Sequence, residues 1–437
     1  MTATASAGPS VESDGGPSPR VVVASVVAST FLVGFGGGVV FPIFPALGSI
    51  LGISPILVGI ILSANRFARL VANAPAGALV DRFGTRTPFV LGLALQAIAT
   101  LGYVISLQAP LPEVWFFVAR VLLGGASALT FATSHTIAAD VTKSDSRGRS
   151  MGMIRGGSIL GFPMGLLLGG VVSEIAGNAP AFGLACVFAV FATALAYVTV
   201  PETHVDDGSK RAVKPWEIDT STPTLTVGVL NAATWFAYMG VLFASLVLFL
   251  EAKSIGVLGF GAQGSSGVFM AVTVLSAALF MFLGGYLSDM ANSRVPAVVL
   301  FLLLLASGFV LLSRADSVWT IVPACLLMGT GMGGTLGPMM ALLADLTPDD
   351  RMGRASGTTN VFSDIGGGFG PVVALPMIDR VGFEPVYLAS AAFPLLAILV
   401  LIIGMYRHTG RVLPATAGEV PTDTMEKSGR SRAEIDD

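Results

Sequence analysis

The chain has 437 residues, of which 53% are hydrophobic and only 12% are charged, and its formal net charge is −3. Soluble domains carry about 25% charged residues, so this composition excludes a soluble protein and favours one that lies in a lipid bilayer. The nearly balanced charge gives no reason to expect a nucleic-acid partner. The two cysteines, Cys186 and Cys325, fall in apolar stretches, so no disulfide framework is expected.

Twelve stretches are apolar and long enough to cross a bilayer, which takes about 20 residues of helix. They are expected near residues 21–48, 54–80, 88–107, 114–138, 150–173, 181–201, 224–250, 261–288, 297–313, 317–342, 355–378 and 385–406. The polar ends 1–20 and 407–437 are expected to be disordered cytoplasmic tails, and 202–223 a cytoplasmic linker. The prediction is an all-α membrane protein with two six-helix bundles, 21–201 and 224–406.

The second half of the chain repeats the first. Residues 139–149 read ADVTKSDSRGR and residues 344–354 read ADLTPDDRMGR, which aligns Asp140 with Asp345 and Arg149 with Arg354. Six predicted helices separate the two copies, so both segments are expected on the same face of the membrane. Two matching halves in a protein this apolar are typical of a transporter whose site lies between them.

The distribution of basic residues predicts the orientation. Most of the 24 Lys and Arg residues fall at the face that carries the repeated segments and both termini. Cytoplasmic loops are enriched in Lys and Arg, so this face is expected to be cytoplasmic. We therefore expect a multi-pass protein of the plasma membrane, functioning as a monomer.

The loop after the second predicted helix carries a compact motif. It reads Gly77-Ala-Leu-Val-Asp81-Arg82-Phe-Gly84-Thr85-Arg86. A glycine at position 77 is expected to allow close packing at the helix end, and Gly84 a tight turn. The motif resembles the helix 2–3 signature of the major facilitator superfamily, although Thr85 stands where that signature usually has a basic residue.

This resemblance covers nearly the whole chain and implies a secondary transporter that works by alternating access. It also implies a latch between the halves at their cytoplasmic ends, for which an anchoring loop without a gating role is the alternative. The residues assigned to this gating motif are Gly77, Asp81, Arg82, Gly84, Arg86, Asp140, Arg149, Asp345 and Arg354. Arg120, which precedes Gly124 and Gly125, resembles the helix 4 signature of the superfamily. The helix 5 antiporter signature is imperfect, because Phe162 separates Gly161 from Pro163.

Charged residues inside predicted spans are the candidates for transport chemistry. An arginine at the centre of a membrane helix costs about 2.5–3.5 kcal/mol, so these side chains should face the protein interior or water. Arg69 and Asp364 are predicted at similar depths on helices that are neighbours in the superfamily, which makes them a candidate pair. Arg120, Arg155 and Asp364 have no charged counterpart in the other half. The predicted substrate or ion pathway comprises Arg66, Arg69, Asn73, Arg120, Arg155 and Asp364, and static pairs or local helix locks are the alternative.

The predicted function is proton-coupled efflux. No nucleotide-binding loop is present, so uphill transport must use an ion gradient, and Asp364 is the only carboxylate predicted deep in the bundle. Burial disfavours the charged form of Asp364 and a nearby arginine favours it, so movement of Arg69 could switch its protonation. No enzyme or metal motif is found, so neither catalysis nor a cofactor is predicted.

The substrate class is less determined than the mechanism. The run Phe41-Pro-Ile-Phe-Pro45 resembles the twelve-helix drug:proton antiporters, which favours drug-like or hydrophobic substrates. Phe67, Trp235, Phe236, Tyr238 and Met239 could line an apolar pocket, or lie in the core or against lipid. An excess of arginine over aspartate within the spans favours an organic anion instead. A non-transporting receptor or scaffold is a third possibility.

Overall fold

The computed structural model describes residues 18–142, 147–203, 218–291 and 293–413. These residues form helices joined by short connections, without a strand among them, and twelve of the helical segments are long and apolar enough to cross a membrane. The predicted all-α fold with twelve spans is therefore confirmed. The N-terminal half contains α1 (Pro19–Gly38), α2 (Val40–Ile50), α3 (Pro55–Phe83), α4 (Arg86–Ser106), α5 (Pro112–Val141), α6 (Arg147–Ala176) and α7 (Asn178–Thr199).

The C-terminal half follows the same plan. It contains α8 (Thr222–Trp235), the π-helix η1 (Phe236–Leu242), α9 (Phe243–Lys253), α10 (Ala262–Asp289), α11 (Val295–Ser313), α12 (Val318–Leu346), α13 (Asp349–Val381) and α14 (Phe383–Thr409). Local chemistry explains several helix ends. Pro55 and Pro112 occupy first-turn positions, where the missing N–H costs nothing. Gly84 ends α3 with a φ of 78°, a conformation that favours glycine.

Small residues bring the helices of each half into close contact. On α6, Gly157, Gly161 and Gly165 face the backbone of α1, where any Cβ would clash with main-chain atoms. On α12, Gly329 and Gly333 face the backbone of α10 in the same way. The four-residue glycine spacing therefore serves close helix packing.

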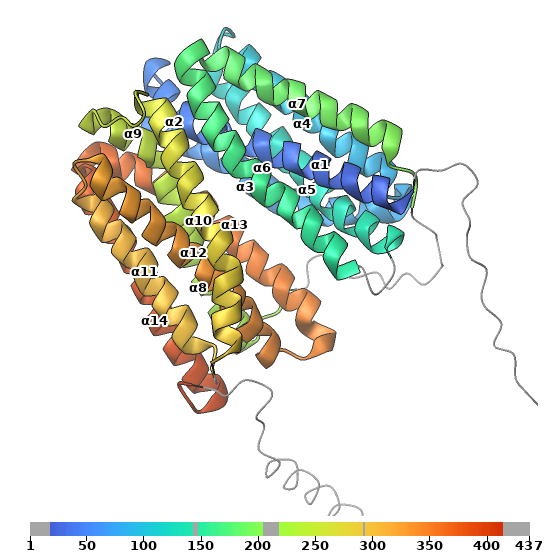
Figure 1. Cartoon of the computed structure of the whole chain (residues 1–437), viewed down its shortest axis with the longest axis vertical. Coiled ribbons are helices and arrows are strands. Elements are labelled where there is room, and N and C mark those ends of the chain that lie inside the picture. The colour runs from blue at the N-terminus through green and yellow to red at the C-terminus, as the bar shows by residue number, and fades with distance from the viewer. Residues whose placement is uncertain (1–17, 143–146, 204–217, 292, 414–437) are drawn as a thin grey trace, which may run out of the picture.

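The two halves touch mainly where α3 meets α13 and α6 meets α10, and also where α2 meets α9 and α10. Gly59 of α3 lies against the carbonyl of Pro371, and Gly170 of α6 lies against Gly267 of α10. These contacts lie toward the ends of the helices that are remote from the chain termini. Toward the other end, which we call the terminal face, the two bundles diverge (Figure 1).

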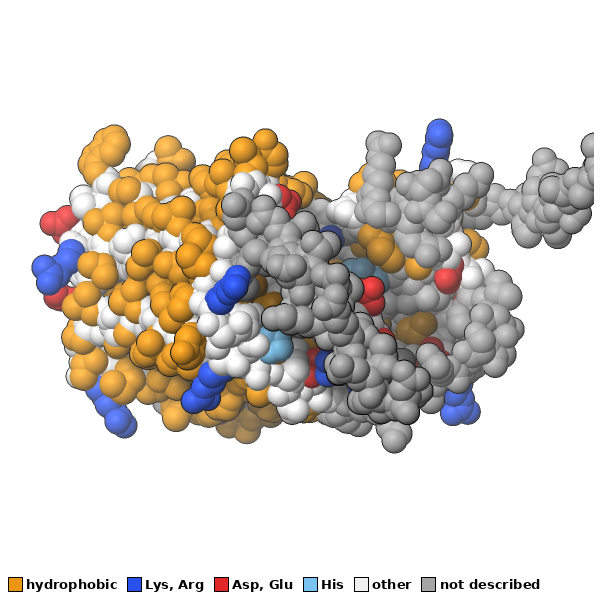
Figure 2. Space-filling model, turned by 90° about the horizontal axis from the view of Figure 1, so that it is seen from below, with side chains coloured by type: hydrophobic (Ala, Val, Ile, Leu, Met, Phe, Trp, Pro, Cys, Tyr) orange, Lys and Arg blue, Asp and Glu red, His pale blue; other side chains and the backbone are white. Residues whose placement is uncertain are grey.

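The outer surface suits a bilayer. Figure 2 looks along the molecule from below and shows flanks covered mainly by hydrophobic side chains, with few charged ones. Between the two bundles the same view shows a hollow in which acidic side chains and a histidine are visible beside residues drawn in grey. The exposed large hydrophobic residues therefore do not mark instability, because in a membrane these flanks meet acyl chains.

The first span of each half is interrupted. Pro19–Ile50 is divided at Val39 into α1 and α2, and Thr222–Lys253 contains the π-helix η1 between α8 and α9. Within η1, Gly240 faces Gly370, so the widened turn of this span lies directly against α13. Single π turns inside α-helices are often found at functional sites.

Candidate functional site

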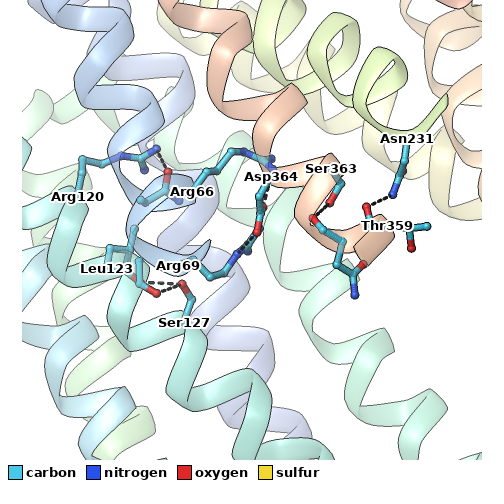
Figure 3. Close-up of polar contacts among 12 residues, drawn as sticks. Arg66, Arg69, Arg120, Leu123, Ser127, Asn231, Thr359, Ser363 and Asp364 are labelled. Atoms are coloured by element: carbon cyan, nitrogen blue, oxygen red, sulfur yellow. Dashed lines mark hydrogen bonds and ion pairs between the residues drawn. The ribbon is translucent and has the colours of Figure 1, made fainter. Parts of the chain in front are cut away.

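Asp364 of α13 is the centre of the candidate site. Asp364 is only 3% exposed, and its carboxylate accepts hydrogen bonds from two arginines of α3 in the other half. Arg66 Nη1 lies 3.3 Å from Oδ1, Arg69 Nε lies 3.1 Å from Oδ2, and Arg69 Nη2 contacts Oδ1. Figure 3 shows both arginine side chains pointing at this carboxylate. The predicted Arg69–Asp364 pair is present, and Arg66 joins it.

We call the surface along which α3 faces α13 the seam. The three charged side chains of the seam are shielded to different degrees, since the Arg66 side chain is 11% exposed and that of Arg69 is 27% exposed. The Arg66 guanidinium carbon also lies 5.1 Å from the centre of the Trp235 ring on α8. Arg66 therefore contacts two helices of the C-terminal half.

Arg120 of α5 has a different environment. It is 1% exposed, and its guanidinium donates to the carbonyl oxygens of Ile61 and Leu62 and to Asn65 Oδ1, all on α3 (Figure 3). Its partners are thus neutral oxygens of its own half. These contacts are those of the local helix lock that the sequence left open as an alternative to a pathway role.

The polar residues in the middle of α3 have different neighbours. Asn65 points at Arg120, whereas Arg66 and Arg69 point at Asp364. Asn73 is exposed one turn beyond Arg69. Arg155 is exposed on α6, which is not one of the two helices that form the seam. The structure therefore brings together three of the six predicted pathway residues.

The aromatic residues suggested as pocket lining also separate. Trp235 contacts Arg66, Phe236 stacks on Phe393, and Tyr238 and Met239 are buried in the core. Phe67 lines a cavity of about 630 Å³ between α3 and α5, to which Val372 of α13 also contributes. Within the described ranges, no three His, Cys, Asp or Glu side chains lie close enough to hold a metal ion.

A model of the Major Facilitator Superfamily matches residues 26–371, which is most of the chain. The chain belongs to the major facilitator superfamily. It is 22% identical over 387 residues to the quinolone resistance protein NorA of Staphylococcus aureus, with 86% of this chain and 95% of NorA covered. The chain is therefore a transmembrane transporter of this superfamily, whose fold works by alternating access.

Solved structures of the superfamily share the fold. A bacterial homologue of the human lysosomal transporter Spinster, in an inward-facing and occupied conformation, gives a TM-score of 0.75 at 16% identity and covers 92% of this chain and 100% of its own. The human organic anion transporter MFSD10 gives a TM-score of 0.60 at 20% identity, covering 88% and 99%. At these identities the likeness concerns the fold alone.

The superfamily's helix 2–3 loop is tied to its own half in this conformation. Glu202, just after α7, accepts hydrogen bonds from the backbone N–H and the hydroxyl of Thr85 at 2.7 and 3.0 Å. The Thr85 hydroxyl also contacts Thr203, whose hydroxyl donates to Asp140 at 3.0 Å. Sequence reasoning missed Glu202 and Thr203, because no spacing rule links residues more than one hundred positions apart.

The remaining gating residues also have local surroundings. Arg86 donates to the Tyr197 carbonyl at 2.8 Å, and Arg82 lies over the Phe83 ring. Asp81 and Arg354 are exposed, and the side chain of Arg149 lies outside the described residues. The close packing expected at Gly77 is wrong for this conformation, because a Cβ there would meet no described atom within 4 Å. The bundles diverge toward this end of α3, which removes the neighbour.

The equivalent loop of the second half is held by ion pairs between side chains. Arg294 bonds both Asp289 and Asp345, the latter at 3.2 Å from Nε. Burial lowers the pKa of Arg294, but its hydrogen bonds to the two carboxylates outweigh burial, so the pKa lies above the ordinary value. Asp345 therefore pairs inside its own half, as its repeat partner Asp140 does.

A second buried acid lies outside the spans. Asp219 precedes α8, is 9% exposed, and accepts hydrogen bonds from the Ser221 N–H at 2.9 Å and from the Thr224 hydroxyl at 3.0 Å. Burial raises the pKa of Asp219, but these hydrogen bonds prevail, so the pKa lies below the ordinary value. All these donors belong to the C-terminal half.

Proposed function

We propose that this transporter exports hydrophobic or drug-like molecules in exchange for protons, with Asp364 as the proton-coupling group. The observation that carries the proposal is the buried contact of Asp364 with Arg66 and Arg69, which joins the two halves. Among the described residues, only Asp364 and Asp219 are buried acids, and Asp364 alone lies inside a span. The name of NorA, a quinolone resistance protein, supports a drug-like substrate.

The coupling follows from the charges at the seam. An ionised Asp364 attracts both arginines and holds α3 against α13. A proton on Asp364 removes this attraction, so a protonated carboxyl favours separation of the halves at this end. A substrate that displaces Arg69 acts on the same contact, which links substrate movement to proton movement.

Transport in proteoliposomes tests this role. Asp364→Asn should abolish accumulation of a fluoroquinolone driven by a pH gradient, while exchange of labelled for unlabelled fluoroquinolone without a gradient continues. Asp379→Asn is the matched control, because Asp379 is an exposed acid on the same helix. Gradient-driven accumulation that survives in Asp364→Asn would refute the coupling role. Absence of fluoroquinolone exchange in the wild type would instead favour a different substrate class.

An organic anion is the second candidate substrate. Two arginines converge on one carboxylate, and Arg120 lies near enough to act on Arg66 electrostatically, so cations outnumber anions at the site. The similar fold of a human organic anion transporter is in keeping with this charge balance. Thermal-shift screening separates the candidates, because anions should stabilise the protein if this alternative holds, and lipophilic cations or neutral drugs otherwise.

We also propose that the protein lies in the plasma membrane as a monomer with its terminal face in the cytoplasm. The excess of Lys and Arg at that face supports this orientation. The seam then closes the outer side, and the structure is open toward the cytoplasm. A membrane-impermeant thiol reagent should label Leu258→Cys in intact cells and Val412→Cys only after permeabilisation, since these exposed residues lie at opposite faces. The reverse labelling pattern would invert the orientation.

A further inference from the structure

Three consecutive glycines of α13 face three different neighbours. A Cβ at Gly366 would clash with the carbonyl group of Ala232 on α8. A Cβ at Gly367 would lie 2.7 Å from the Arg66 guanidinium carbon, and one at Gly368 would lie 3.0 Å from the Phe67 ring. The first glycine therefore lets α13 approach its own half, and the next two let it approach α3.

Gly367 makes room for one charged group in particular. It lies one helical turn after Asp364, so both residues present themselves on the same face of α13. The carboxylate of Asp364 accepts a hydrogen bond from Arg66, and the bare backbone at Gly367 leaves space for the planar head. The Trp235 ring, 5.1 Å from the guanidinium carbon, provides another wall. A guanidinium is suited to such a position, because it stacks on aromatic rings and is weakly hydrated.

Arg69 reaches the same carboxylate under different conditions. It donates through two nitrogens, Nε and Nη2, and its side chain is 27% exposed against 11% for Arg66. The charged groups that act on Arg66 are Arg69 on the same helix, Arg120 on α5 and Asp364 on α13. Two of these three are cations, so Arg66 needs contacts other than charge to stay in place.

We propose that Gly367 and Trp235 form a seat that holds Arg66 beside Asp364 whenever α3 and α13 are in contact, while Arg69 is the arginine whose bond to Asp364 a substrate breaks. Arg66 is then a positioning residue, and Gly367 determines its position. The inference rests on the proposed coupling role of Asp364, and it divides the work between two arginines that the sequence does not distinguish.

A methyl group at position 367, in the space that the Arg66 guanidinium occupies, tests the seat. Gly367→Ala places a methyl group against the guanidinium, which can move because it is the end of a flexible side chain. We expect the maximal rate of gradient-driven fluoroquinolone transport to fall on the order of tenfold, with KM unchanged, as one charged hydrogen bond is lost. Gly357→Ala is the matched control on the same helix, because a Cβ there meets no described atom within 4 Å. Equal rates in both variants would overturn the proposal.

Trp235 fluorescence gives a readout that does not depend on transport. In a background where the other three of the four tryptophans are phenylalanine, Gly367→Ala should change the emission of Trp235 as Arg66 leaves the ring, and Gly357→Ala should not. Unchanged emission in Gly367→Ala would refute the seat even if Asp364 proves to couple protons. An emission change with driven transport intact in Asp364→Asn would keep the seat and remove the coupling.

A double-mutant cycle with Arg66→Lys completes the test. Lysine keeps the charge but lacks the planar head, so an alanine at position 367 should cost little more once Arg66 is lysine. Additive losses would show that Gly367 acts independently of Arg66 and would overturn the proposal. If Gly367→Ala fails to fold, Trp235→Leu removes the other wall and should lower the rate, while Trp235→Phe should largely preserve it.

Discussion

Buried charges in this protein fall into two groups according to where their partners come from. Arg120 and Asp219 are satisfied within one half, by carbonyl and amide oxygens of α3 and by Ser221 and Thr224 respectively. Asp364 is satisfied by arginines of the opposite half. All three residues are at most 9% exposed. Burial alone therefore does not separate them.

The origin of the partner matters because the halves must move relative to each other in alternating access. A charge bonded within its own half keeps its partners in every conformation, so its contacts contribute to folding. A charge bonded across the seam loses or keeps its partners according to the conformation, so its contacts set the balance between conformations. A cross-seam partner is thus a better mark of a transport residue than a position deep in the membrane.

The largest expected effect comes from removing the shared carboxylate. Asp364→Ala leaves two arginines at the seam without their anion, and breaking a buried ion pair from one side costs about 3–5 kcal/mol. We expect a loss of thermal stability together with a longer distance between spin labels at Ile56 and Met377, which are exposed on α3 and α13. Both quantities can be measured on the purified transporter.

Charge balance provides the control for that experiment. Asp364→Ala combined with Arg69→Gln leaves one uncompensated cation instead of two, so it should regain part of the lost stability. Asp379→Ala, at an exposed acid of α13, should change neither quantity. If Asp364→Ala behaves like Asp379→Ala, the seam is not held by these charges, and Asp364 does not differ from the charges that are bonded within one half.

A smaller effect is expected from Arg120→Lys. A single ammonium cannot replace the guanidinium that bonds Ile61, Leu62 and Asn65 together, and lost hydrogen bonds to a buried charge cost about 1.5–3 kcal/mol. The unfolding temperature should fall, while the spin-label distance and proton coupling stay as in the wild type. Arg69→Lys should instead change the spin-label distance and the proton coupling while the unfolding temperature stays as in the wild type. Loss of coupling at full stability in Arg120→Lys would move Arg120 to the transport group.

The smallest effect is expected from Asp219→Asn, at about 1 kcal/mol, because the amide keeps some of the hydrogen bonds. The pKa of Asp219 is lowered on folding, so its ionised form stabilises the protein above the ordinary aspartate value of about 3.9. The stability difference from the wild type should be constant above that pH and vanish as the pH falls through the lowered pKa. A difference that grows on acidification would contradict the assignment, and transport should be unaffected throughout.

Sequence reasoning reached the fold and one contact of the site. Apolar length, the repeat and the helix 2–3 motif predicted twelve spans in two halves, because each of these signals is local or periodic. Counting about 1.5 Å per residue from the loops placed Arg69 and Asp364 at similar depths, and the pair exists. Depth carries no information on direction, which is why Arg120 was grouped with Arg69 although it points into its own half.

The contacts that sequence could not predict involve groups without a pattern. The partners of Arg120 include backbone carbonyls, which every residue has, and Glu202 reaches a loop far away in the chain. Gly367 looks like the other glycines of α13 until the position of Arg66 is known. At Gly77 the motif predicted contact where the observed conformation has none, because a single sequence encodes several conformations of the pathway.

The π-helix η1 has a mechanical consequence. A π turn holds one residue more between its hydrogen-bonded groups than an α turn does, so η1 is a widened segment in an otherwise regular α-helical span. A π turn can shift along a helix by exchanging one hydrogen bond at a time. The segment on one side then rotates against the other without unfolding. Gly240 of η1 packs against Gly370, so such a rotation would act directly on α13.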